Sequence, residues 1–312
     1  MARVLRKVMT LAAVAVLPSA ALAIGTAGVA DAAPAAFPAQ YAAPYLQLSS
    51  STVGDMVSDR NASGVNHYTL AFLTPRSGCT AQWEAGNFPV GSFTNEIKAV
   101  QAAGGDVIIS FGGAAGGELA QTCTSAASLQ AAYANIVKTY NVHRLDFDIE
   151  GGPLNDTASI ARRDQALAAL QKADPSVQVD YTLPVAPSGL LGNALNLLRD
   201  AKSKGVNVNL VNIMTMDFGN GHNPLNDAES GANGTAGQLA SLYGITTAAA
   251  WHRIGLTPIA GKNDDNENFT QANATTLEQF AAAKGVQELS FWEVDAYDKK
   301  VGYAYSKIFN KI

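Results

Sequence analysis

The chain has 312 residues, of which 47% are hydrophobic and 15% are charged, and its formal net charge is −5. This composition is typical of a folded protein with a large core and excludes an intrinsically disordered chain. The mild acidity argues against nucleic acid or an anionic membrane as the main partner, because both attract basic surfaces.

Residues 1–32 have the pattern of a secretory signal peptide. Arg3, Arg6 and Lys7 form a basic start, a long apolar run follows, and residues 30–32 (ADA) match an A-x-A cleavage site. A retained membrane anchor and an earlier cut after Ala23 are the alternatives. Proline and glycine interrupt the apolar run, which favours removal. We therefore expect a secreted, extracellular protein without membrane attachment.

Cys79 and Cys123 are the two cysteines of the chain. In an exported protein an even number of cysteines indicates a disulfide, which we expect to stabilise the fold by about 2–4 kcal/mol. The cysteine spacing fits no zinc pattern, and the four histidines do not cluster in the sequence. The sequence therefore predicts no metal and no cofactor.

From residue 41 onward, short apolar runs alternate with longer amphipathic stretches. The runs predict strands at 45–50, 67–73, 106–113, 143–150, 178–185, 209–217, 253–261 and 288–295. The stretches predict helices at 94–103, 126–140, 157–173, 192–204, 234–250, 273–284 and 297–311. Eight strands alternating with helices indicate an α/β fold, the (β/α)8 TIM barrel, with residues 33–312 as a single catalytic domain. A dinucleotide-binding fold has no support, because no G-x-G-x-x-G turn follows the first strand.

The fourth predicted strand, HRLDFDIE (143–150), carries Asp146, Asp148 and Glu150 at alternate positions. Successive side chains of a strand face opposite sides, so the three acids would all point into the barrel. Glu150 comes last, at the end of the strand where TIM barrels hold their active sites. A solvated edge strand and a magnesium or calcium site are the alternatives. The neighbouring apolar strands favour buried acids with a catalytic role.

Most glycosidases place two carboxylates across the scissile bond, whereas these acids are stacked along one strand. The stacked arrangement fits the substrate-assisted mechanism, in which the 2-acetamido oxygen of the sugar attacks the anomeric carbon. Such an enzyme needs one acid and a neighbouring carboxylate that stabilises the positive charge on the acetamido group. Glu150 and Asp148 are the candidates for these two roles.

Four motifs then resemble those of family-18 glycoside hydrolases, in particular the secreted bacterial chitinases. LDFDIE is similar to the D-x-x-D-x-D-x-E signature, SFGG (110–113) to S-x-G-G, and MTMD (214–217) to M-x-Y-D. SFWEVD (290–295) puts Trp292 at the position of the tryptophan under the −1 sugar. The resemblance implies retaining hydrolysis of β-1,4-linked N-acetylglucosamine polymers, with chitin or chito-oligosaccharides as partners.

The resemblance also implies a role for each site residue. Glu150 would protonate the glycosidic oxygen and later activate water, while Asp148 would bind the acetamido N–H and rotate between Asp146 and Glu150. The implied substrate-binding residues are Asp217, Trp292, Tyr45, Met214, Ser110 and Tyr181, the last of which has core packing as its alternative.

The sequence departs from the family pattern at three positions. His143 and Arg144 replace the first Asp and the following Gly of the signature, far from the bond that is cut. Met216 replaces the tyrosine of M-x-Y-D, whose hydroxyl normally binds the acetamido carbonyl. Loss of such a donor can lower the rate by about 10²-fold or more. Tyr181 is a candidate to supply the hydroxyl from another strand.

Three other functions stay open from the sequence. The first is a chitin-binding lectin on the same fold, although such a protein would be expected to lose the acid at Glu150. The second is an endo-β-N-acetylglucosaminidase acting on N-glycans by the same mechanism. The third is a two-carboxylate glycosidase that pairs Glu150 with Glu293. The polar segment 261–270 either lines the cleft or forms an ordinary solvated loop.

Overall fold

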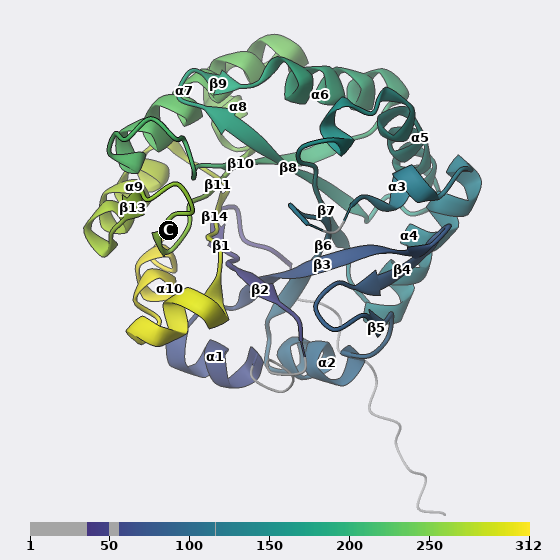
Figure 1. The fold of residues 1–312 in the computed structure, drawn as a ribbon, viewed down its shortest axis with the longest axis horizontal. Coiled ribbons are helices and arrows are strands. Elements are labelled where there is room, and N and C mark those ends of the chain that lie inside the picture. Colours follow the sequence, from purple (N-terminus) through teal and green to yellow (C-terminus); the bar gives the residue numbers. More distant parts are fainter. Residues whose placement is uncertain (1–35, 50–55, 116) are drawn as a thin grey trace, which may run out of the picture. The chain divides into compact units, whose positions relative to one another are not determined.

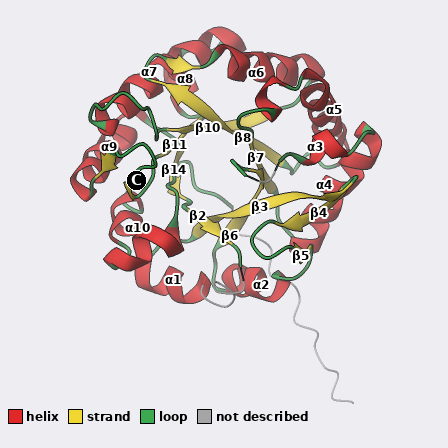
Figure 2. Cartoon of the chain, in the orientation of Figure 1, coloured by secondary structure: helices red, strands yellow, loops and turns green. Residues whose placement is uncertain are grey.

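The computed structural model describes residues 36–49, 56–115 and 117–312. The predicted signal peptide, 1–32, lies outside the described residues. Residues Ala33–Ile312 form one compact unit, and in its described part a ring of strands is surrounded by helices (Figures 1 and 2). The unit therefore has the predicted α/β architecture of a TIM barrel.

A strand lies in each of the eight predicted ranges, and a short strand, β1, which was not predicted, precedes the first of them. The ring strands are β1 (Tyr41–Ala42), β2 (Tyr45–Gln47), β3 (His67–Ser77), β6 (Asp106–Gly112), β7 (Arg144–Asp148), β8 (Gln178–Ala186), β10 (Val208–Met214), β11 (Ile254–Thr257) and β14 (Glu288–Leu289). They pair in the order β1-β14-β11-β10-β8-β7-β6-β3, all in parallel, and β2 pairs with β3. The strand ladder is thus interrupted between β1 and β2, at Ala43 and Pro44, where proline has no N–H to donate.

Five further short strands lie outside the ring. They are β4 (Thr80–Trp83) beside β3, β5 (Phe88–Pro89) beside β4, β9 (Gly189–Leu190) beside β8, and the hairpin of β12 (Gly261–Lys262) and β13 (Asn268–Phe269). The predicted disulfide joins Cys79, in the turn between β3 and β4, to Cys123 with a Cα–Cα distance of 4.4 Å.

The helices are α1 (Met56–Ser63), α2 (Thr94–Ala102), α3 (Leu119–Thr122), α4 (Ala126–Tyr140), α5 (Thr157–Ala173), α6 (Gly192–Lys204), α7 (Pro224–Tyr243), α8 (Thr247–Trp251), α9 (Gln271–Lys284) and α10 (Ala304–Phe309). Two predictions were wrong. The helix predicted at 234–250 is two helices, because Asn223 caps α7 earlier in the chain and the left-handed Gly244 ends it. The helix predicted at 297–311 is interrupted by Gly302, after a π-helical turn and a 3₁₀ turn.

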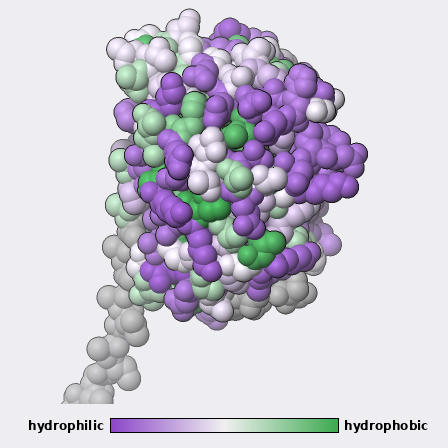
Figure 3. Space-filling view, turned by 90° about the vertical axis from the view of Figure 1, so that its left-hand side faces the viewer, coloured by the Kyte–Doolittle hydropathy of each residue, from purple (hydrophilic) through white to green (hydrophobic). Residues whose placement is uncertain are grey.

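The strands bury both of their faces. On the outer face of β6 and β7, the rings of Phe111 and Phe147 stack with centroids 5.2 Å apart, and Tyr133 of α4 packs edge-on against both. Because Phe147 faces the helices, the neighbouring Asp146 and Asp148 face the barrel interior. The side of the unit that carries α9 has a largely hydrophilic surface with separate apolar patches (Figure 3). None of the helices in the described ranges has the length and apolarity needed to cross a membrane.

Candidate active site

A pocket opens beside the C-terminal ends of the strands, where a TIM barrel holds its active site. It contains most of the residues that the sequence predicted to act on substrate. These are Tyr45, Asp148, Glu150, Met214, Asp217 and Trp292. Met216, which replaces the family tyrosine, lines the same pocket. The parallel strands thus bring together residues from distant parts of the sequence.

Asp146 lies at the base of the column of acids, where three hydroxyl groups hold it. Tyr45 and Ser110 donate to its Oδ2 at 3.0 and 2.6 Å, and Thr182 donates to its Oδ1 at 2.8 Å. Burial raises the pKa of Asp146 to about 7, although these hydrogen bonds lower it. Ser110 therefore acts on the acids from below, as predicted, through a direct hydrogen bond.

Asp148 and Glu150 form a pair of interacting carboxyl groups above Asp146. Burial raises the pKa of Asp148 well above its usual range, and the charges of Glu150 and Asp146 raise it further. Burial also raises the pKa of Glu150, while the hydrogen bond from Asp148 lowers it. The pKa of both carboxyl groups is therefore raised, and a hydrogen bond joins them. Asp148 Oδ1 is a buried acceptor that has no hydrogen-bond partner among the described residues, so it is free to bind a polar group of a ligand.

Asp217 follows β10 and lines the same pocket as this pair. Its backbone has the left-handed φ of 50°, which is uncommon for a residue other than glycine. Burial raises the pKa of Asp217, while hydrogen bonds from the backbone N–H groups of Asp265 and Asp264 lower it. The charge of Asp217 in turn raises the pKa of Glu150. Asp264 also lines the pocket, so the segment 261–270 reaches the cleft.

Three aromatic rings form an apolar wall of the pocket. Trp292 stacks on Phe72 with centroids 5.6 Å apart and an interplanar angle of 9°, and Tyr45 lies about 6 Å from both. Sequence reasoning missed Phe72, because a phenylalanine within an apolar strand gives the same signal in the core and in a pocket. Such a wall can bind the apolar face of a sugar ring.

Tyr181 is a correction to the predicted site. It pairs with Phe147 in the sheet, so it points outward like Phe147, while its neighbour Thr182 points inward. Its hydroxyl donates to Asp164 of α5, and Arg163 lies over its ring at 5.4 Å. Tyr181 therefore packs between the barrel and α5 and does not supply the hydroxyl that Met216 lacks.

Glu293 is not placed to act as the second carboxylate of a conventional glycosidase. Its carboxylate accepts hydrogen bonds from the backbone N–H groups of Asp295, at 3.0 Å, and Ala296. It therefore caps the π-helical turn Val294–Asp298, and it does not line the pocket.

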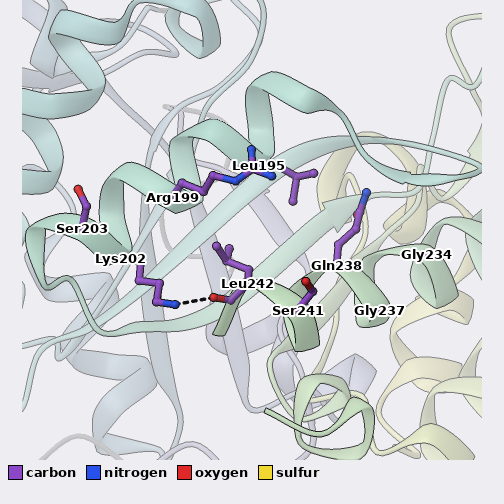
Figure 4. Close-up of a pocket in the computed structure, with 9 residues that line it drawn as sticks. All are labelled: Leu195, Arg199, Lys202, Ser203, Gly234, Gly237, Gln238, Ser241 and Leu242. Atoms are coloured by element: carbon purple, nitrogen blue, oxygen red, sulfur yellow. Dashed lines mark hydrogen bonds between the residues drawn. The ribbon is translucent and has the colours of Figure 1, made fainter. Parts of the chain in front are cut away.

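A second pocket, of 850 Å³, lies between α6 and α7 (Figure 4). Its lining includes Arg199 and Lys202, and Lys202 donates to the carbonyl of Leu242 at 2.6 Å. Its lining contains no carboxylate, histidine or cysteine, so it has no pair of carboxyl groups like that of Asp148 and Glu150. Within the described ranges, no three acids, histidines or cysteines gather in a way that could hold a metal ion.

Comparison with known proteins bears directly on this site. The model of the glycosyl hydrolases family 18 matches residues 41–305. The "Probable bifunctional chitinase/lysozyme" of Escherichia coli (strain K12) is 34% identical over 279 residues, which cover 83% of this chain and 31% of that protein. "Endochitinase 11" of Metarhizium anisopliae is 33% identical over 275 residues, which cover 83% of this chain and 53% of that protein. The chain thus spans about a third and about half of the length of these two relatives.

Solved structures agree with the fold. The catalytic domain of the hyperthermophilic chitinase from Pyrococcus furiosus is 31% identical, with a TM-score of 0.81 over 89% of this chain and 96% of that chain. A family GH18 chitinase from Chromobacterium violaceum, at 15% identity and a TM-score of 0.60, covers 91% of this chain and 86% of that chain and shares the fold. The family model matches most of the chain, and the chain shares the fold of the Pyrococcus furiosus catalytic domain. Asp148 and Glu150 of the family signature line one pocket. The chain therefore belongs to family 18 of the glycosyl hydrolases.

Proposed function

We propose that the protein is a chitinase, which hydrolyses the β-1,4 linkages of N-acetylglucosamine polymers by a retaining, substrate-assisted mechanism. The observation that carries this proposal is the column of three acids, in which Asp148 and Glu150 line the pocket and are joined by a hydrogen bond above the buried Asp146. The relatives named as chitinases support the choice of substrate.

The geometry supports a two-step reaction. Glu150 gives its proton to the glycosidic oxygen while the acetamido carbonyl oxygen of the same sugar attacks the anomeric carbon and the leaving sugar departs. Glu150 then takes a proton from water, which attacks the anomeric carbon and opens the cyclic intermediate, so the configuration is retained. The free Oδ1 of Asp148 accepts the acetamido N–H and stabilises its positive charge.

The aromatic wall of Trp292 and Phe72 binds the flat face of the sugar at the cleaved bond. Met216 offers no hydroxyl to the acetamido carbonyl, so this substrate contact of the family is absent at that position. We also propose that the chain is exported and acts outside the cell, as the pattern of residues 1–32 and the disulfide favour.

The test is hydrolysis of chitotetraose and of cellotetraose by the purified protein and by the Glu150→Gln variant. We expect cleavage of chitotetraose only, and a loss of about 10²- to 10⁴-fold in kcat for Glu150→Gln, because the general acid and base is gone. Glu293→Gln is the matched control and should keep most of the activity.

Other outcomes distinguish the other functions. Cleavage of cellotetraose would overturn the acetamido-dependent mechanism, and loss of activity in Glu293→Gln would favour a pair of carboxylates. Binding to chitin without cleavage would indicate a lectin. The E. coli relative is named for both chitinase and lysozyme activity, so peptidoglycan serves as a further substrate in the same assay, and an N-glycan serves to detect endo-β-N-acetylglucosaminidase activity.

A further inference from the structure

Two loops at the mouth of the pocket are joined by hydrogen bonds that run in both directions. One loop, residues 217–223, follows β10, and the other is the turn of the β12–β13 hairpin. Asp217 Oδ1 accepts the backbone N–H groups of Asp264 at 2.8 Å and Asp265 at 3.3 Å. In return, Asp265 Oδ2 accepts the backbone N–H of Gly219 at 2.7 Å.

Glu267 lies between the two loops, and its carboxylate accepts hydrogen bonds from three backbone N–H groups. It accepts the N–H groups of Phe218, Asn220 and Gly221, each at 3.3 Å, and its side chain is buried. The loop has left-handed residues at alternate positions, with φ of 50° at Asp217, 66° at Gly219 and 72° at Gly221. Such alternation turns successive N–H groups to one side and makes a concave site for an anion. Here the carboxylate of Glu267 occupies that site.

The hairpin that carries Glu267 is anchored in the core of the unit. Phe269 is fully buried, and its carbonyl accepts the hydroxyl of Tyr305 at 2.7 Å. Within the hairpin, the N–H of Asn263 donates to the carbonyl of Glu267 at 2.8 Å. Glu267 therefore connects a fixed element to the loop that begins at Asp217.

We infer that Glu267 is a positioning residue for catalysis: it holds the loop after β10 in the conformation that keeps Asp217 in the pocket that Glu150 lines. The left-handed backbone of Asp217 persists only where its surroundings impose it, and the bonds to Glu267 begin at the next residue along the chain. This inference rests on the proposed function, because hydrolysis is its readout. Sequence reasoning found Asp217 but gave no role to Glu267.

Release of Asp217 has an electrostatic consequence that a purely structural role would not produce. Two neighbouring groups act on Glu150 in opposite directions: the hydrogen bond from Asp148 on β7 lowers its pKa, and the charge of Asp217 after β10 raises it. If Asp217 moves away, this pKa falls. Since the general acid must carry its proton, the basic limb of the pH profile of kcat/KM then shifts to lower pH.

The experiment compares Glu267→Gln, Asp217→Asn and the double variant in the full chain with chitotetraose. Glu267→Gln keeps the shape of the side chain but removes its negative charge and at least one acceptor, so we expect kcat/KM to fall about 10- to 100-fold. The basic limb should shift to lower pH, as it should in Asp217→Asn. The double variant should be no more than about twofold slower than Asp217→Asn, because Glu267 acts through Asp217.

Glu118→Gln is the matched control. Glu118 is also a buried carboxylate that accepts a backbone N–H group, that of Ala120 at 2.9 Å, and it does not line the pocket. We expect this variant to melt at a lower temperature with an unchanged pH profile. If Glu267→Gln does not fold, Asp265→Asn removes the neighbouring bond to Gly219 and is measured in the same way.

A wild-type kcat/KM and pH profile in Glu267→Gln, or losses that multiply in the double variant, would overturn the inference. Binding of chitotetraose, followed by tryptophan fluorescence, is measured on the same variants. An inactive wild type would therefore refute the proposed function while the binding data still test the inference, which predicts weaker binding in both Glu267→Gln and Asp217→Asn and no further loss in the double variant.

Discussion

At the scale of single residues, Asp146 is a buried carboxyl group whose ionisation lowers the stability of the folded protein. Three hydroxyl groups hold its buried carboxyl, and none of these hydrogen-bond partners is a cation. An ionised carboxylate in such a place loses its hydration, which explains why burial raises the pKa of Asp146 to about 7. The proposed mechanism gives this group a role beside Asp148, whose pKa the charge of Asp146 raises.

Replacement of Asp146 by Asn should stabilise the protein at high pH. In the folded protein Asp146 keeps its proton up to about pH 7, whereas in the unfolded chain it loses the proton near pH 4. Between these values the folded state holds more protons, so a rise in pH lowers the free energy of unfolding. Asparagine cannot ionise, so Asp146→Asn should raise the free energy of unfolding by about 2–4 kcal/mol at pH 8 and have little effect at pH 4.

Thermal melts of both proteins at pH 4 and pH 8 measure this difference, and the activity of the variant should fall. An equal change in melting temperature at the two pH values would contradict the prediction. Ser110→Ala serves as a control, because it removes one hydroxyl from Asp146 and should lower stability at high pH.

The sequence also contains the pattern that corrects the predicted role of Tyr181. Along β8 the polar residues Asp180 and Thr182 alternate with Val179, Tyr181 and Leu183, so the alternation itself assigns Tyr181 to the apolar face. The family resemblance led to Tyr181 as a substitute for the hydroxyl that Met216 lacks, whereas the alternation of side chains along the strand argues against it. Phe72 could not be recognised in the same way, because the register of β3 against β6 shifts between Leu70 and Leu73, so strand parity does not assign its face.

At the scale of elements, the boundaries of helices depended on caps more than on periodicity. Asn223 and Pro224 are a strong start signal, with the side chain of Asn223 accepting the N–H of Leu225 at 3.1 Å. Several small residues within α7 weaken its hydrophobic pattern, and the prediction placed the start too late. The strands were found more reliably, because their apolar runs are short and separated by turn residues.

The disulfide should contribute measurable stability at this scale. Cys79 and Cys123 are separated by 44 residues, and they link the turn after β3 to the end of α3. Closing a loop of this length restricts the unfolded chain, so the Cys79→Ala/Cys123→Ala variant should lose about 2–4 kcal/mol of unfolding free energy. Urea denaturation measures the loss. Added reductant should lower the wild type to the level of the variant and leave the variant unchanged; a variant as stable as the oxidised wild type would contradict the prediction.

At the scale of the whole molecule, the pocket is assembled from strands that are far apart in the sequence. Asp148 and Glu150 come from β7 and the residues after it, Asp217 follows β10, and Trp292 follows β14. The order of parallel strands brings the ends of these segments to one side of the barrel. The family motifs predicted that these residues share one site, and strand alternation predicted which side chains face inward.

Export should leave a mature protein that begins after the A-x-A site. Expression of the full chain in a secreting host should yield extracellular protein whose mass and N-terminal sequence correspond to a start at Ala33, with the disulfide formed. Replacement of Ala30 and Ala32 by bulky residues should prevent this cut. Retention of the whole chain in the membrane fraction would favour an anchor instead, and a start at Ile24 would favour the earlier site.

The sequence by itself determined the eight strands, the acids of β7 and their inward direction, because periodicity and strand parity are local properties of the chain. It also determined the pairing of the two cysteines, since no other partner exists for either. Only the tertiary structure decided that Glu293 caps a turn, that Phe72 joins the pocket, and that Glu267 reaches the loop after Asp217. These three depend on contacts between segments distant in the chain, and no local pattern encodes which backbone N–H group a carboxylate will meet.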